Sequence, residues 1–183
     1  MNTGLTGRAV VLNYDPRVPS EGGLRLHEVF GWSDPHAMVK EFERDLEFAT
    51  GGAIDIRVVE FRDLDDFPEQ ADGYRPMPDE WVRKWRTGGP WHGQRTNFAK
   101  LVEKQGLVAM VNSGAVDEIW CCGPPAEVDL FGETWMAGPN AFYINGSTFP
   151  EIPFDRAIAG YGFNYERAVG EMLHNLGHRT EDS

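Results

Sequence analysis

The run RAVVLNYD, residues 8–15, is a short β-branched and apolar segment that ends at Asp15-Pro16. Such a run is typical of a strand buried on both faces. Downstream, Ser33-Asp34-Pro35 combines helix-capping residues with a proline suited to a first helical turn, and apolar residues follow at spacings of three and four until Gly51-Gly52. A second alternating run, Ala53–Phe61, predicts another strand. A strand, a helix and a strand in this order predict a parallel pair joined by a right-handed crossover.

The rest of the chain continues the alternation of strands and helices. Two more strands and three helical regions are predicted, at residues 117–122 and 157–163 and at residues 79–85, 96–114 and 165–176. The glycine- and aromatic-rich segment Phe131–Phe149 predicts one or two short strands or an ordered loop. We therefore predict a single α/β domain over residues 1–183, three-layered, with a mostly parallel central sheet of about four or five strands and helices on both faces.

The composition excludes several classes of protein. The 183 residues carry 17 basic and 29 acidic side chains, a net charge of −12. Because a negative field repels phosphate backbones and no apolar run approaches the roughly 18 residues of a membrane span, we expect no nucleic-acid binding and no membrane insertion. Residues 1–8 lack the apolar stretch of a secretory signal. This favours a cytoplasmic protein, although a secreted protein whose leader has been removed has the same features.

The predicted C-terminal helix carries ionisable side chains opposite its apolar side. Glu171, His174 and His178 are spaced three and four residues apart, so they lie on one stripe. Two imidazoles and a carboxylate suit Zn²⁺ and leave a coordination position open for water, which predicts these three residues as zinc ligands. The same stripe is also typical of a solvated helix face, because histidines near a helix C-terminus gain from the macrodipole.

Gly177 determines whether the two histidines can share an ion. A helix that continues through His178 places this residue one turn beyond His174, whereas a left-handed glycine ends the helix. We predict that the helix ends at Gly177, because glycine followed by polar residues is a usual stop signal. His178 would then point toward the sheet end, as a general base or as a structural histidine.

The segment Gly170–His178 resembles the zinc helix of metzincin proteases. The resemblance implies that Glu171 is the general base and that His174 is a zinc ligand. Gly170 and Thr180 stand where that family has its first and third ligands. The resemblance therefore concerns the helix and not a complete metzincin zinc site.

Several longer stretches are similar to an uncharacterised family of predicted α/β proteins, many of them secreted. These stretches are Asp117–Trp120, Met136–Pro139, Gly162–Leu173 and Gly177–Glu181. The resemblance directs attention to a group of polar residues, namely Asn164, Glu166, Glu171, His178, Arg179 and Glu181. From this group we expect Glu171, Glu166 and His178 to be catalytic, with Glu166 or Glu181 as a further metal ligand or base.

A second group of polar residues follows from the strand order. In parallel sheets, ligands bind beyond the carboxyl ends of the strands, where Asn13-Tyr14-Asp15, Cys121-Cys122-Gly123 and Asn164-Tyr165-Glu166 are expected to converge. We therefore expect ligand contacts from a set of five side chains: Asn13, Asp15, Asn164, Tyr165 and Arg179.

The adjacent Cys121 and Cys122 predict no disulfide framework. Two interpretations remain for them, a cysteine hydrolase with His27 or His178 as its base and a buried pair of small apolar side chains.

Two further patterns have two interpretations each. The carboxylates between Asp63 and Asp72 suit either a Ca²⁺ site or a solvated acidic loop, and their spacing does not match an EF-hand. Trp81, Trp85 and Trp91 suit either stacking on a sugar or core packing.

The predicted function is that of a metal-dependent hydrolase-like protein with its site on the C-terminal helix, acting on an unidentified small molecule, peptide or glycan. The alternative is a non-catalytic ligand- or partner-binding module whose surface is formed by aromatic residues and the loop Phe131–Phe149.

Overall fold

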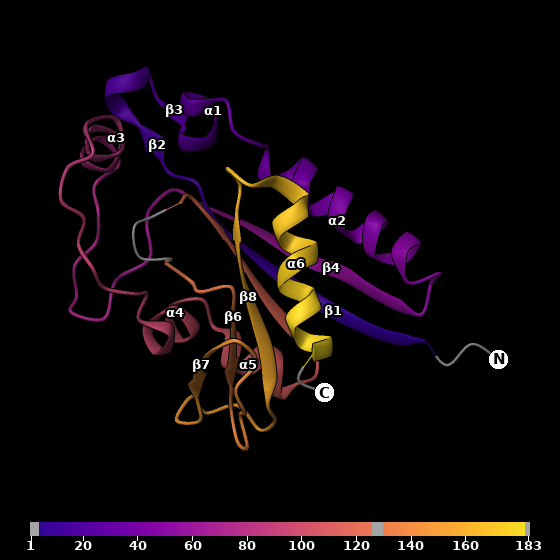
Figure 1. Ribbon diagram of the computed structural model, residues 1–183. Helices are drawn as coiled ribbons and strands as arrows, with labels where there is room; N and C mark the ends of the chain where they lie inside the picture. Colours follow the sequence, from indigo (N-terminus) through magenta and orange to yellow (C-terminus); the bar gives the residue numbers. More distant parts are fainter. Residues whose placement is uncertain (1–3, 126–129, 182–183) are drawn as a thin grey trace.

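The computed structural model describes residues 4–125 and 130–181, and its centre is a six-stranded sheet in the order β4-β1-β5-β8-β6-β7 (Figure 1). The strands are β1 (Leu5–Tyr14), β4 (Ile54–Leu64), β5 (Glu118–Gly123), β6 (Thr134–Ala137), β7 (Gly146–Phe149) and β8 (Ile158–Asn164). β4, β1, β5 and β8 are parallel, whereas β6 is antiparallel to β8 and β7 is parallel to β6. The predicted α/β fold with a mostly parallel sheet is confirmed, and the sheet has six strands because both short strands of the segment Phe131–Phe149 join it.

Helices cover both faces of the sheet, as predicted. The helices that follow the main strands are α2 (Pro35–Ala49), α3 (Pro78–Thr87), α4 (Phe98–Lys104), α5 (Leu107–Asn112) and α6 (Ala168–Glu181). α2 and α6 pack on one face, and the side chains of α3, α4 and α5 pack on the other. After β1 the chain makes a short excursion above the sheet end through β2 (Arg17–Val18), a 3-10 turn (Pro19–Glu21), β3 (Leu24–Arg25) and α1 (Leu26–Phe30).

β1 lies inside the sheet and is buried on both sides. Val10 and Leu12 contact the core beneath α3, α4 and α5, whereas Ala9 and Val11 contact the core beneath α2 and α6. Val10 pairs directly with Ile119 in the parallel register of β1 and β5. Because side chains alternate along a strand, Asn13 continues the row of Ala9 and Val11 at the carboxyl end of β1.

A β-bulge explains why the apolar alternation of β4 slips. Ala9 pairs with Val58 and Val10 pairs with Glu60, so Val59 is an extra residue on β4. The backbone N–H of Val58 donates to the side chain of Glu43 on α2 at 2.8 Å. The bulge allows apolar residues on both sides of it to pack toward α2, as both Val58 and Phe61 do.

α2 begins as its sequence predicts. The Asp34 carboxylate caps the helix by accepting the N–H of His36 at 2.9 Å, and Pro35 is the first helical residue. Four buried side chains fix the helix on the sheet, those of Met38, Val39, Phe42 and Leu46. Across residues 4–125 and 130–181, none of the helices combines the length and the apolar character needed to cross a bilayer.

Candidate functional site

The C-terminal helix α6 runs unbroken past Gly177 to Glu181. The prediction that Gly177 ends the helix is therefore wrong, because this glycine is not among the residues with positive φ. Met172 is fully buried against the sheet, Leu176 is nearly so, and Asn175 donates to the carbonyl oxygen of Gly162 at 2.7 Å. These contacts hold the last turns in helical conformation and override the local stop signal.

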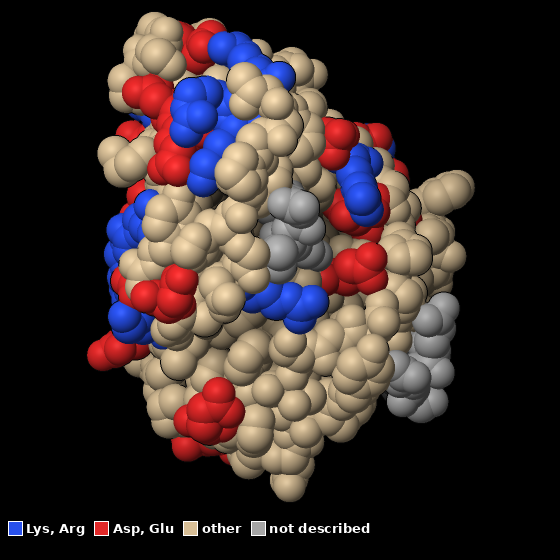
Figure 2. Space-filling view, turned by 60° about the vertical axis from the view of Figure 1, so that its left-hand side comes forward, with Lys and Arg blue, Asp and Glu red and all other residues tan. Residues whose placement is uncertain are grey.

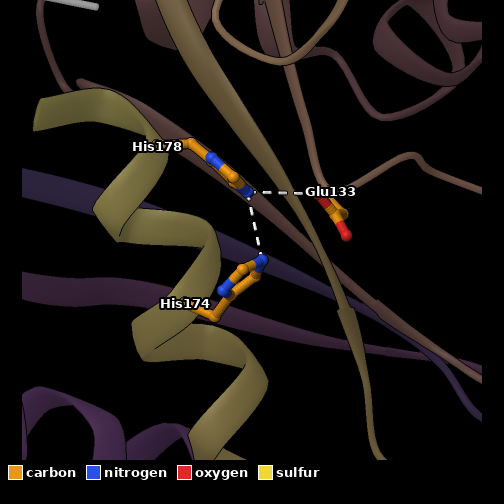
Figure 3. Close-up of side chains that lie close together, drawn as sticks. All are labelled: Glu133, His174 and His178. Carbon is orange, nitrogen blue, oxygen red and sulfur yellow. Dashed lines mark hydrogen bonds and ion pairs between the residues drawn. The ribbon is translucent and has the colours of Figure 1, made fainter. Parts of the chain in front are cut away.

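The continued helix brings three metal-ligating side chains together (Figure 3). His174 and His178 project from α6 toward Glu133, which immediately precedes β6, and one ligand atom of each of the three lies within 4.8 Å of the others. The Nε2 atoms of His174 and His178 are 3.1 Å apart, and His178 Nε2 is 3.3 Å from a carboxylate oxygen of Glu133. His174 is exposed, whereas the side chain of His178 is only 16% exposed.

Asn145 holds the sheet side of this cluster in place. Its amide nitrogen lies 2.9 Å from the carboxylate of Glu133 and 3.0 Å from Nε2 of His178. Asn145 adopts a positive φ of 56°, which asparagine tolerates better than most residues, immediately before β7 begins at Gly146. Glu133 and Asn145 are thus brought side by side because they precede two paired parallel strands.

Glu171 lies elsewhere on α6. One of its carboxylate oxygens accepts the N–H of Asn164 at 2.9 Å, and the other pairs with Arg167 at 3.3 Å. Among the described residues, the group that can share an ion is formed with Glu133 and not with Glu171. The two histidines of the predicted ligand set are therefore brought together, and the carboxylate beside them is that of Glu133, immediately before β6.

The predicted convergence at the strand ends does occur. Asn13 pairs with Cys122, and Gly123 pairs with Asn164, so the carboxyl ends of β1, β5 and β8 form one edge. Tyr165 is fully buried there, and its hydroxyl lies 3.4 Å from the carbonyl oxygen of Tyr14. Burial raises the pKa of the Tyr165 phenol well above its usual value. Tyr165 is thus a neutral side chain packed between the strand ends.

The remaining predicted residues lie at the turn into α6 or beyond it. The Asn164 side chain accepts the N–H of Glu166 at 2.9 Å, which shapes the turn, and Glu166 itself is exposed. The side chains of Arg179 and Glu181 lie outside the described residues.

Cys121 and Cys122 are fully buried on opposite faces of β5. Burial raises the pKa of both thiols, so neither is present as the thiolate that nucleophilic catalysis requires. The geometry matches the interpretation of a buried pair.

The acidic loop and the tryptophans have structural partners. Asp66 pairs with Arg75 and Lys104, and Asp72 contacts the ring of His92, so these carboxylates have separate side-chain partners. Trp81 is 2% exposed and stacks on Trp85 with ring centroids 5.4 Å apart, within the core that lies under α3.

Comparisons with models of protein families, with curated proteins and with solved structures found no match. The site must therefore be interpreted from its own geometry. Sequence spacing could identify His174 and His178, but it could not identify Glu133 and Asn145, which lie in an irregular segment without a recognisable ligand motif.

Proposed function

We propose that the protein binds a divalent transition metal ion through Glu133, His174 and His178, and that the ion serves hydrolytic chemistry. The observation that carries the proposal is the approach of two imidazole nitrogens and a carboxylate oxygen from two separate elements of the fold. The two Nε2 atoms are 3.1 Å apart. Such a contact is favourable if one ring donates a hydrogen bond to the other, or if the lone pairs of both nitrogens point at a shared cation.

The distances favour zinc. Two ligands of a tetrahedral Zn²⁺, each about 2.0–2.1 Å from the ion, are about 3.3 Å apart. The separations of 3.1 Å between the histidine nitrogens and 3.3 Å between His178 and Glu133 are close to this value. Two imidazoles with one carboxylate are also a ligand set that zinc accepts in catalytic sites. Two of the three ligand separations therefore already suit a zinc ion.

Three protein ligands leave one position of a tetrahedral ion for water. Zinc lowers the pKa of such a water to about 7, which supplies a hydroxide nucleophile at neutral pH. The position of His174 at the surface gives water and substrate access to the ion. Asn145 would keep its contact with Glu133 and thereby orient the carboxylate ligand.

The alternative is a binding module without catalysis, favoured by the aromatic side chains beside the cluster. Phe142 and Tyr143 are 53% and 65% exposed, and the hydroxyl of Tyr143 lies 3.4 Å from the side-chain oxygen of Asn145. Exposed aromatic rings of this kind contact ligands or partner proteins. The two functions differ in whether zinc-loaded protein hydrolyses an activated ester such as p-nitrophenyl acetate faster than the metal-free protein does.

The test is zinc binding by protein prepared without a histidine tag, measured by titration calorimetry and elemental analysis. We expect one zinc per chain and a melting temperature that falls in chelator, because a ligand that binds only the folded state stabilises it by about 2.7 kcal/mol at 100 times its Kd. The matched variants are Glu133→Gln, which should lose zinc, and Glu171→Gln, which should retain it.

Two results would overturn the proposal. One is wild-type protein without stoichiometric zinc and with unchanged melting in chelator. The other is loss of zinc in Glu171→Gln with retention in Glu133→Gln, which would assign the site to the helix alone. The double variant His174→Ala, His178→Ala should lose zinc under either ligand set.

A further inference from the structure

A polar pocket of about 260 Å³ lies at the carboxyl ends of β1 and β4, on strands that take no part in the metal cluster. Asn13 and Asp63, which pair in the sheet register, form its floor. Arg17, Arg25 and His27 reach it from the excursion that follows β1, and the start of α2 completes its wall. This is the edge at which parallel α/β sheets bind ligands.

The pocket contains a buried side chain with an unused hydrogen-bonding atom. Asn13 is 1% exposed, and its amide nitrogen donates to Asp63 at 2.9 Å. Its amide oxygen has no hydrogen-bond partner among the described residues. Because a buried acceptor without a donor is unfavourable, a ligand that brings a donor to this oxygen gains affinity.

His27 is held in the pocket by Asp15, which is fully buried. Nδ1 of His27 lies 2.6 Å from one carboxylate oxygen of Asp15, and the backbone N–H of His27 donates to the other at 3.1 Å. Burial raises the pKa of Asp15, and the hydrogen bonds from His27 oppose this rise. A carboxylate on Nδ1–H fixes the tautomer that leaves Nε2 as a proton acceptor.

The other described histidines that pair with aspartates use the opposite ring nitrogen. His36 contacts Asp63 through Nε2, and His92 contacts Asp72 through Nε2. Within this set, the arrangement suited to a general base is therefore that of His27. The side chain of His27 is 15% exposed, so it is largely enclosed by the residues around it.

From this geometry we infer that the pocket is a second site, which binds a small neutral polyol or sugar and in which His27 Nε2 accepts a hydrogen bond from a hydroxyl group of the ligand. A hydroxyl group can donate to Asn13 Oδ1 or His27 Nε2 and can accept from Arg17 and Arg25. The carboxylates around the pocket, four against two guanidinium groups, disfavour an anion. The volume is below the roughly 300–1,000 Å³ of pockets for drug-sized ligands, which favours a small molecule.

The first test is the tautomer of each histidine, read from nitrogen-15 NMR of the imidazole rings at a pH where they are neutral. We expect the Nδ1–H form for His27 and the Nε2–H form for His36 and His92, so the protein contains its own controls. An Nε2–H tautomer at His27 would overturn the inference. The variant Asp15→Asn should remove the preference at His27, and the wild-type spectrum decides the question if that variant does not fold.

The second test is amide NMR of the wild-type protein titrated with D-ribose or with inorganic phosphate. We expect ribose to shift the signals of Asn13 and His27, and we expect phosphate to leave them in place. The shifts should be lost in Asn13→Ala and retained in His174→Ala, which separates this site from the metal site. No shift with ribose, or shifts with phosphate alone, would overturn the inference.

Discussion

Gly160 lies where β8 passes beneath the indole ring of Trp135. A Cβ added at this position would meet ring atoms of Trp135 at 2.0 and 2.2 Å, and Trp135 is fully buried between other core side chains. The indole ring cannot move away, because Phe98 packs against it with ring centroids 4.8 Å apart. The absence of a side chain at Gly160 is therefore what allows β6 to pair with β8.

We expect Gly160→Ala to lower the free energy of unfolding by at least about 1–3 kcal/mol, the usual cost of overpacking a core. The matched control is Gly7→Ala on β1, where the added Cβ would meet Ile56 at an ordinary 3.5 Å. Urea unfolding measures both variants. Equal stability of the two would show that Trp135 can move and would contradict this account.

At the scale of single residues, the sequence could predict two of the three side chains of the candidate metal site. His174 and His178 share a stripe on any helix, because their spacing alone places them one turn apart. The contribution of Glu133 depends on β6 pairing with β8, which no local pattern encodes. The burial of Asn175 on the core side of α6 could not be predicted either, because its hydrogen-bond partner is a backbone carbonyl of β8.

At the scale of elements, α6 and α2 contrast in how far local signals determine them. The start of α2 follows from Asp34 and Pro35, whose effects act within one turn. The end of α6 follows instead from tertiary contacts, because Leu176 and His178 on either side of Gly177 both contact the sheet layer. Helix propensities of about 1 kcal/mol are too small to oppose several such contacts.

The variant Gly177→Ala tests the continuity of α6. Gly177 lies inside a helix and has no atoms within 4 Å of an added Cβ, so alanine should raise the free energy of unfolding by about 0.5–1 kcal/mol. Gly170→Ala, in the same helix and with the same open space, is the companion variant. Thermal unfolding of metal-free protein measures both. Destabilisation by Gly177→Ala would indicate a left-handed glycine and a helix that ends there.

At the scale of the whole molecule, the layers and the parallel core of the sheet could be predicted because hydrophobic periodicity determines them. The positions of β6 and β7 could not, since strands of four residues carry too little pattern to specify a partner. Figure 2 shows Lys and Arg side chains lying among Asp and Glu side chains on one face, in place of a patch of one sign. Acidic side chains on this face therefore lie beside basic ones.

These ion pairs predict the response to acid. Burial alone would raise the pKa of Asp117, but hydrogen bonds from Arg8 and Arg156 outweigh it and hold the pKa below its usual value. A hydrogen bond from Lys84 likewise lowers the pKa of Glu80. A carboxyl group with a lowered pKa contributes stability above its ordinary pKa of about 4, and this stability is lost as the pH falls through the folded-state pKa.

We therefore expect the free energy of unfolding to fall as the pH decreases below about 4. Asp15 acts in the opposite direction, because its raised pKa makes the folded state less favourable as the pH rises above the ordinary value. Urea unfolding at a series of pH values measures the combined effect of these groups on the free energy of unfolding. Asp117→Asn should make the loss of stability in acid smaller. Constant stability down to pH 2 in the wild type would contradict the prediction.

The two outer strands of the sheet have a consequence for self-association. An unpaired strand edge is a template on which further copies of a chain can add and grow into fibres. β4, which has eleven residues, carries Asp55, Arg57, Glu60 and Arg62 along this edge, and the bulge at Val59 interrupts its regular backbone. β7 offers only four residues at the opposite edge. The charges and the bulge of β4 and the shortness of β7 therefore protect the sheet against edge-to-edge aggregation.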